Sequence, residues 1–123
     1  MFEDERTDAV DAVLRHVVEH GAVVPSLWKL EVANALQTAI RRRRIDETFI
    51  DAALGNLAVL DIAIDDETDR VAWSTTVLLA QRHGLTTYDA ASLELARRRQ
   101  LPIATLDQAL IHASANAQVS LFA

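Results

Sequence analysis

The apolar positions of this chain follow a helical period in some segments and a strand period in others. Apolar residues recur every three or four positions between Val10 and Val18. This spacing predicts a helix that is capped by Thr7 and ends at Gly21. The next residues, 22–25, are rich in valine and closed by a proline, so they predict a brief buried strand.

The same two periods divide the rest of the chain into alternating helices and strands. Helices are predicted over 26–43, 46–57, 65–84, 85–100 and a short stretch from 107, with caps at Ser26, Asp46, Asp65 or Asp66, and Asp107. Short or alternating apolar runs predict strands at 59–64, 102–105 and 118–122. Strands that alternate with helices favour an α/β sandwich, in which helices cover a parallel sheet.

Two of these helices carry side chains that we expect in the core. In the helix over 65–84 the period directs Val71, Val77 and Leu78 inward. Trp28 and Trp73 lie at helical spacing among apolar residues, which favours a core or interface position over a base-stacking role.

Composition narrows the class of protein. The chain has 123 residues, half of them hydrophobic, which suits a single domain with a real core. It has no cysteine, no long apolar run and no signal-peptide pattern at its start, so we expect a soluble cytoplasmic protein without disulfides. The formal net charge of −6 argues against nucleic-acid binding by bulk charge. Seven of the twelve Lys and Arg residues nevertheless lie in two short segments, 41–44 and 97–99. A local basic patch is therefore compatible with the negative net charge.

Three acidic residues stand out by their positions in the predicted elements. Asp107 follows a strand, where sites form in parallel sheets, but an N-cap explains it equally well. Glu31 flanks the apolar face of its helix, and a solvated acid is the alternative. Asp89 shares a face with Leu93 and Ala96, so it needs a partner if that face is buried; a helix-start acid is the alternative. If all three converge, they form an all-oxygen pocket suited to Mg²⁺ or Mn²⁺, the usual equipment for phosphodiester hydrolysis.

Three segments together resemble the motif regions of PIN-domain ribonucleases, in particular VapC-type toxins of bacterial toxin–antitoxin pairs. These segments are "VPSLWKLEVANAL", "LTTYDAASLELARRR" and "LPIATLDQAL", and they match in order and spacing across nearly the whole chain. The resemblance implies one PIN-like domain over residues 1–123, folded as a three-layer α/β/α sandwich with a central, mainly parallel sheet. It also implies a divalent-metal endoribonuclease that cuts structured or transfer RNA.

The resemblance assigns residues and partners as well. Three family acids correspond to Glu31, Asp89 and Asp107, which would bind Mg²⁺ or Mn²⁺. Asn34 corresponds to the polar residue of an "E-x-x-N-A" segment, and Thr105 to a small hydroxyl residue two positions before the last acid. The arginines that we expect to contact RNA phosphates are Arg41, Arg42, Arg43, Arg44, Arg97 and Arg98, with helix-end charge compensation as the alternative. The family's partners are a cognate antitoxin and a second copy of the chain.

The start of the chain departs from the family pattern. Family members begin with a strand that ends in an aspartate, whereas here "FEDER" follows Met1 directly. Asp4 and Asp8 are expected to be solvated acids and do not obviously replace that aspartate. We expect an N-terminally shortened form in which Met1 is an internal methionine of a longer reading frame; a truncated paralogue is the alternative.

A function without catalysis follows from the second interpretation. A chain with an incomplete metal site would keep its antitoxin-binding surface and act by binding alone. This hypothesis belongs to a different class from the nuclease, because it requires neither a cation nor an RNA substrate.

Overall fold

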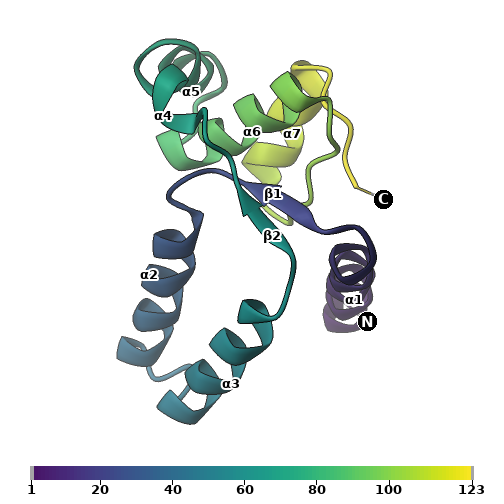
Figure 1. Ribbon diagram of the computed structural model, residues 1–123, viewed down its shortest axis with the longest axis vertical. Coiled ribbons are helices and arrows are strands. Elements are labelled where there is room, and N and C mark those ends of the chain that lie inside the picture. Colours follow the sequence, from purple (N-terminus) through teal and green to yellow (C-terminus); the bar gives the residue numbers. More distant parts are fainter. Residues whose placement is uncertain (1, 123) are drawn as a thin grey trace. The chain divides into compact units, whose positions relative to one another are not determined.

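The computed structural model describes the backbone of residues 2–122 and the side chains of residues 11–122. The fold is mixed α/β and mainly helical (Figure 1). Its elements are α1 (Phe2–His20), β1 (Ala22–Val24), α2 (Trp28–Arg41), α3 (Glu47–Ala58), β2 (Ile62–Ile64), α4 (Thr68–Val71), the π-helical turn η1 (Ala72–Thr76), α5 (Val77–His83), α6 (Thr87–Arg99) and α7 (Gln108–Asn116). In this described part of the chain, no helix is long and apolar enough to cross a membrane.

The two strands form a small parallel sheet. Ala22 N–H donates to the carbonyl of Asp61, and Asp65 N–H donates to the carbonyl of Val24, so both strands run in the same direction. The predicted strands at 102–105 and 118–122 are reduced to one parallel bridge between Ile103 and Leu121. Parallel pairing is therefore present, while the three-layer sandwich stays a prediction.

The chain divides into two compact units. The N-terminal unit comprises Met1–Ala22 and Leu27–Ala63, and the C-terminal unit comprises Val23–Ser26 and Ile64–Ala123. The expectation of a single domain over 1–123 is not tested by this division and stays a prediction.

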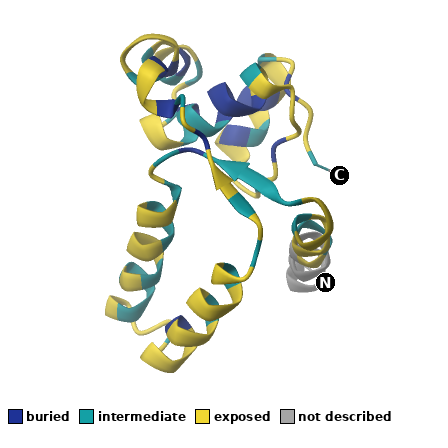
Figure 2. Ribbon diagram, in the orientation of Figure 1, coloured by how far each residue is buried: buried dark blue, intermediate teal, exposed yellow. Residues whose placement is uncertain are grey.

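The C-terminal unit contains the main hydrophobic core. Figure 2 shows buried residues concentrated on α6 and α7. The core joins one face of α6 to α7 and to the segments around the Ile103–Leu121 bridge. Its buried members are Leu93, Ala96, Ile103, Leu110, Ala113 and Val119. The core therefore ties α6 to α7, the two helices that begin near Asp89 and Asp107.

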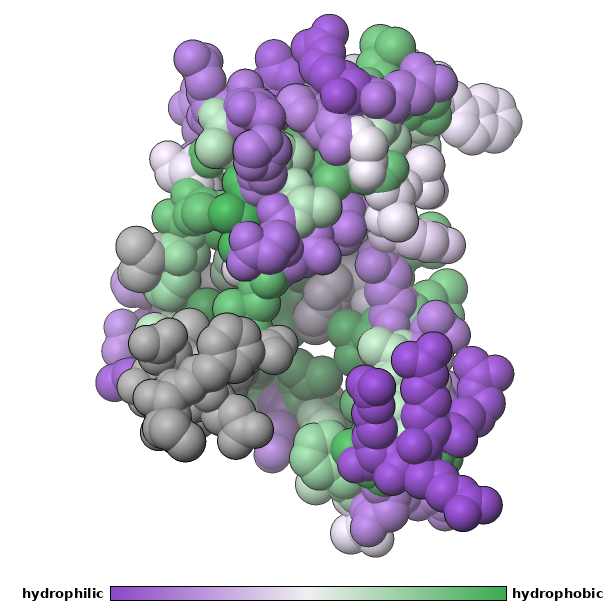
Figure 3. Space-filling view, turned by 180° about the vertical axis from the view of Figure 1, so that it is seen from behind, coloured by the Kyte–Doolittle hydropathy of each residue, from purple (hydrophilic) through white to green (hydrophobic). Residues whose placement is uncertain are grey.

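The N-terminal unit is more open. Helix α2 has no buried residue, and α3 buries only Ile50. Between these helices lies an apolar groove of about 260 Å³, lined mainly by Trp28, Val32, Leu54 and Leu57. Figure 3 shows hydrophilic side chains over the turn between α2 and α3, the position of the four arginines.

Local signals predicted several helix ends correctly. The Asp46 carboxylate caps α3 by accepting from Phe49 N–H at 2.9 Å. Gly84 ends α5 and Gly21 follows α1, both with positive φ. At Gly21 a Cβ atom would lie 2.9 Å from the carbonyl oxygen of Asp61, so glycine is needed for space as well as for conformation.

Other predicted caps were wrong. Helix α1 begins at Phe2, which places Thr7 inside it. Helix α2 has Leu27 at its cap, and the Ser26 hydroxyl donates instead to Asp69 at 3.1 Å. Helix α4 begins only at Thr68, because Asp65 takes a different role that is described below. Ser26 and Asp65 thus bind partners that are distant in the sequence, which local sequence patterns do not predict.

A π-helical turn explains an error in the predicted core. A residue inserted by this turn shifts the helical register after it. Val71 before the turn is buried as predicted, but Leu78 after it is 62% exposed and Leu79 is 3% exposed. Trp73, within the turn, is 97% exposed, so it does not lie in the core, and the interface position stays a prediction.

The register shift can be tested with two neighbouring leucines. We expect Leu79→Ala to lower the free energy of unfolding by about 2–5 kcal/mol, because it opens a cavity in the core. Leu78→Ala serves as the matched control and should change it by less than about 0.5 kcal/mol. Urea unfolding measures both, and a larger loss for Leu78→Ala would contradict the π-helical register.

Candidate functional site

Asp89 lies in the first turn of α6 and is partly buried. Its backbone N–H donates to the hydroxyl of Thr86, the N-cap residue, at 3.1 Å. Burial raises the pKa of the Asp89 carboxyl, and the nearby charge of Asp107 raises it further, while a hydrogen bond with Thr86 acts in the opposite direction. Asp89 is therefore a carboxylate whose negative charge the fold does not fully compensate.

Asp107 is positioned by two hydrogen bonds at the start of α7. Its carboxylate accepts from Leu110 N–H at 2.9 Å and so caps the helix as predicted. Its own N–H donates to the hydroxyl of Thr105 at 3.0 Å. Thr105 thus orients the backbone from which the Asp107 side chain projects, and the carboxylate is exposed to solvent.

The two aspartates are close enough to interact electrostatically. Each belongs to the N-terminal end of a helix, where the helix dipole favours negative charge. The packing of α6 against α7 brings these two ends into the same region of the C-terminal unit. The charge of Asp107 raises the pKa of Asp89, and a cation placed between two such carboxylates would be attracted to both, which makes this pair the candidate site.

Two further predicted site residues, Glu31 and Asn34, belong to the N-terminal unit. Glu31 lies in the first turn of α2 and is partly buried, and Asn34, one turn later, is exposed. Convergence of Glu31 with Asp89 and Asp107 stays a prediction, since Glu31 belongs to one compact unit and the two aspartates to the other. Among the residues that the structure describes, no group of three or more His, Cys, Asp or Glu side chains is arranged to hold a metal. The side chains of Asp4 and Asp8 lie outside the described part.

The predicted RNA-contacting arginines fall into two kinds. Arg41–Arg44 are all exposed, at the end of α2 and in the turn that follows. Arg97 is exposed as well. Arg98 instead has a side chain that is only 20% exposed and lies among carboxylates.

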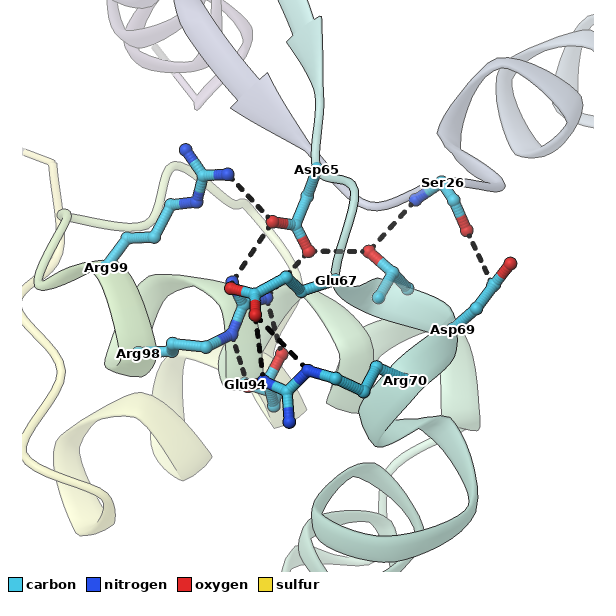
Figure 4. A network of polar contacts seen from close by, with 9 residues as sticks. Ser26, Asp65, Glu67, Asp69, Arg70, Glu94, Arg98 and Arg99 are labelled. Atoms are coloured by element: carbon cyan, nitrogen blue, oxygen red, sulfur yellow. Dashed lines mark hydrogen bonds and ion pairs between the residues drawn. The ribbon is translucent and has the colours of Figure 1, made fainter.

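A buried ion-pair cluster around Asp65 was not predicted from the sequence (Figure 4). The Asp65 side chain is fully enclosed and lies directly after β2. Both of its oxygens accept from Arg98, at 3.1 and 2.6 Å. Arg99 donates to Oδ1 at 2.9 Å, and the Thr68 hydroxyl donates to Oδ2 at 2.9 Å. This carboxylate is therefore compensated from two sides, by the end of α6 and the start of α4.

Arg98 is the centre of the cluster. Its guanidinium also donates to both oxygens of Glu94, at 2.8 and 3.0 Å, and to Glu67 at 3.1 Å. Glu67 in turn pairs with Arg70 at 3.0 Å. Asp65, Glu94 and Arg98 form the enclosed part of this cluster, while Glu67, Arg70 and Arg99 surround it with side chains that are 38–62% exposed.

The cluster shifts the protonation of its members in a consistent direction. Hydrogen bonds from Arg98 hold the pKa of Asp65 well below its usual range, although burial alone would raise it. Hydrogen bonds to Glu94 and to Asp65 raise the pKa of the Arg98 guanidinium above its ordinary value. The four-residue spacing of Glu94 and Arg98 was visible in the sequence as a helical ion pair. The pairing with Asp65, 33 positions away, gave no such signal.

Comparisons with protein-family models, with curated proteins and with solved structures gave no match.

The uncompensated charge of Asp89 predicts a gain in stability on its removal. The raised pKa means that the folded state disfavours the ionised form, so Asp89→Asn should raise the melting temperature at pH 7.5 in the presence of a chelator. This gain should shrink as the pH falls, because the parent carboxyl then becomes protonated. Differential scanning calorimetry measures it. Asp46→Asn is the matched control, since asparagine caps a helix as well as aspartate does, and a melting temperature for Asp89→Asn at or below the parent's would contradict the account.

The compensated charge of Asp65 predicts the opposite behaviour. Asp65→Asn should lower the free energy of unfolding at pH 7 by about 3 kcal/mol, because it leaves buried guanidinium donors without their carboxylate. The folded pKa of Asp65 lies below the unfolded value of 3.8, so its contribution is full above that pH and declines below it. Urea titrations should therefore show that the difference in the free energy of unfolding between the parent and Asp65→Asn becomes smaller from pH 7 to pH 3. A difference that becomes larger would contradict the lowered pKa of Asp65.

Proposed function

We propose that this chain is a divalent-metal-dependent endoribonuclease with a PIN-like, three-layer α/β/α fold. The observation that supports the proposal best is the pair Asp89–Asp107. These residues lie at the starts of two packed helices, and burial together with the charge of Asp107 raises the pKa of Asp89. Helix capping alone does not require two carboxylates that repel each other, whereas a cation site does. The sequence motifs around both residues agree with a nuclease.

The residues of the site fit Mg²⁺ or Mn²⁺. All candidate donors are oxygens, which these hard cations prefer, and the absence of cysteine fits the same class of ion. Asp89 and Asp107 would bind the ion, Glu31 would supply a third carboxylate, and Asn34 would support it with an amide. When bound, the ion supplies charge neutralisation at the phosphate and lowers the pKa of a water molecule.

The chain's own residues would prepare this site in two ways. Thr105 orients Asp107 through the 3.0 Å bond to its N–H, and Thr86 fixes the backbone of Asp89. Like-charge repulsion between the two aspartates, which destabilises the free protein, becomes favourable attraction once a cation is present.

RNA would be held by exposed arginines. Arg41–Arg44 and Arg97 are accessible to phosphates, and contacts of this kind position a substrate without reading its sequence. Because the whole chain carries a net charge of −6, binding would be local and would weaken strongly with salt. Arg98 has its donors on carboxylates and is left out of this set.

The proposed biological setting is a cytoplasmic toxin–antitoxin pair. A cognate antitoxin and a second copy of the chain are the proposed partners, on the strength of the sequence resemblance. The apolar groove between α2 and α3 offers a surface on which a partner could bury apolar side chains.

A non-catalytic binding protein is the second candidate. The observation that favours it is that the described residues contain no group of three metal-binding side chains. In this case Asp107 would act as a helix cap, and the groove of α2 and α3 would carry the function by binding the antitoxin.

Cleavage of RNA distinguishes the two candidates. We expect the purified chain to cut a structured RNA in the presence of Mg²⁺ or Mn²⁺ and to lose activity in a chelator. Asp89→Asn and Asp107→Asn should each reduce the rate by at least roughly 100-fold, because each removes a metal ligand. Asp46→Asn, a cap on α3, is the control and should leave the rate unchanged. Cleavage that persists at the parent rate in both variants would eliminate the proposed site.

A further inference from the structure

The cluster around Asp65 connects the end of α6 to the chain that leaves the sheet. Asp65 follows β2 directly, and its own N–H donates to the carbonyl of Val24, the last residue of β1, at 2.8 Å. Its carboxylate then receives Arg98 and Arg99 from the last turn of α6. Helix α6 is thus attached at its C-terminal end to the point where both strands end.

We infer that Asp65 and Arg98 are positioning residues for Asp89: the buried ion pair fixes how far α6 extends toward α7. This inference rests on the proposed function, in which the placement of Asp89 relative to Asp107 matters for catalysis. Neither Asp65 nor Arg98 is placed in contact with substrate or cation.

The contacts of α6 differ in how well they fix its axial position. The buried apolar side chains of the helix are Ala90, Leu93, Leu95 and Ala96, and two of these four are single methyl groups. Apolar packing is non-directional, and small side chains oppose sliding along the helix axis only weakly. A guanidinium that donates to both oxygens of one carboxylate has a fixed geometry, so Arg98 and Asp65 set a position that the apolar contacts do not.

Helix α6 connects Arg98 at its end to Asp89 at its start. Asp89 precedes Arg98 by nine residues in one helix, which corresponds to about 13.5 Å of rise. The helix is capped by Thr86 at its start, and a displacement at its end is therefore carried to Asp89. Asp107 is held at the start of α7 by its own helix cap, while α7 contacts α6 through the apolar core around Leu93 and Leu110. Because apolar contacts are non-directional, sliding of α6 along this core would change the separation of the two carboxylates.

A positioning role of Arg98 and a role in RNA binding have different kinetic consequences. A phosphate contact by Arg98 would affect substrate affinity, and hence KM and its salt dependence. A positioning role would affect kcat, because a displacement of about 1 Å at a reacting group can cost roughly 100-fold in rate. The small exposure of Arg98 and its contacts with three carboxylates favour positioning.

The test replaces the ions by apolar side chains and leaves the fold intact. In the triple variant Asp65→Leu, Glu94→Leu and Arg98→Met, no buried charge is left without its partner, and such replacements often preserve or increase stability. Because the chain has no cysteine, spin labels can be placed at Tyr88→Cys and Gln108→Cys, exposed positions in the first turns of α6 and α7. Electron–electron resonance then measures the distance between the two helix starts in folded protein, independently of any activity.

We expect the triple variant to unfold cooperatively, to show a shifted or broadened distance distribution, and to lose roughly 10- to 100-fold in kcat with KM unchanged. Arg82→Met is the matched control, since Arg82 lies in the last turn of α5 outside the cluster, and it should change neither quantity. If the triple variant does not fold, Arg98→Lys replaces it, because lysine keeps the charge without the planar fork.

Each result bears on the inference. An unchanged distance distribution would overturn it, and so would a changed distribution with kcat unaltered, or a change confined to KM. If the parent cuts no RNA, the proposed function fails; a shifted distance would then still support the control of α6 by Asp65 and Arg98, and an unchanged distance would overturn that as well.

Discussion

The side chain of Asp65 is fully enclosed, and a carboxylate in that position is stable only when hydrogen-bond donors surround it. Arg98, Arg99 and Thr68 satisfy this requirement from α6 and from α4. The Thr68 hydroxyl, in turn, accepts from the N–H of Ser26, which follows β1. One group of polar contacts therefore joins the end of α6 to the segments that follow β1 and β2. Helices α5 and α7 of the C-terminal unit both contact α6, the helix that this constraint holds at its end.

The two perturbed aspartates of this unit show opposite electrostatic behaviour. The pKa of Asp65 is lowered because arginines within the fold compensate its charge, whereas the pKa of Asp89 is raised because burial and Asp107 oppose its charge. A group of the first kind stabilises the folded protein at neutral pH, and a group of the second kind destabilises it. A residue that destabilises the folded protein in this way is a candidate for a binding site. This contrast links the stability of the unit to the function that we propose for it.

Local sequence signals predicted the features that depend on neighbouring residues. The caps at Asp46 and Asp107 and the helix end at Gly84 follow from side chains and backbone conformations within one turn. The same reasoning failed at Ser26 and Asp65, because their partners lie 43 and 33 positions away. Pattern reasoning also failed after the π-helical turn, because a period of 3.6 residues assumes that no residue is inserted. The strands at 102–105 and 118–122 were predicted from composition, which identifies apolar segments but not their partners. At the candidate site, Asp89 and Asp107 do interact, while the contribution of Glu31 from the other unit stays a prediction.

The most direct test of the account is a calorimetric titration of the purified chain with Mn²⁺. If Asp89 and Asp107 form a cation site, the parent should bind Mn²⁺ with micromolar affinity, and binding should release protons near the raised pKa of Asp89, because the carboxyl must ionise to act as a ligand. Asp89→Asn and Asp107→Asn should each remove this binding, whereas Asp46→Asn should retain it. An absence of binding in the parent, or the same isotherm in all four proteins, would contradict the central claim.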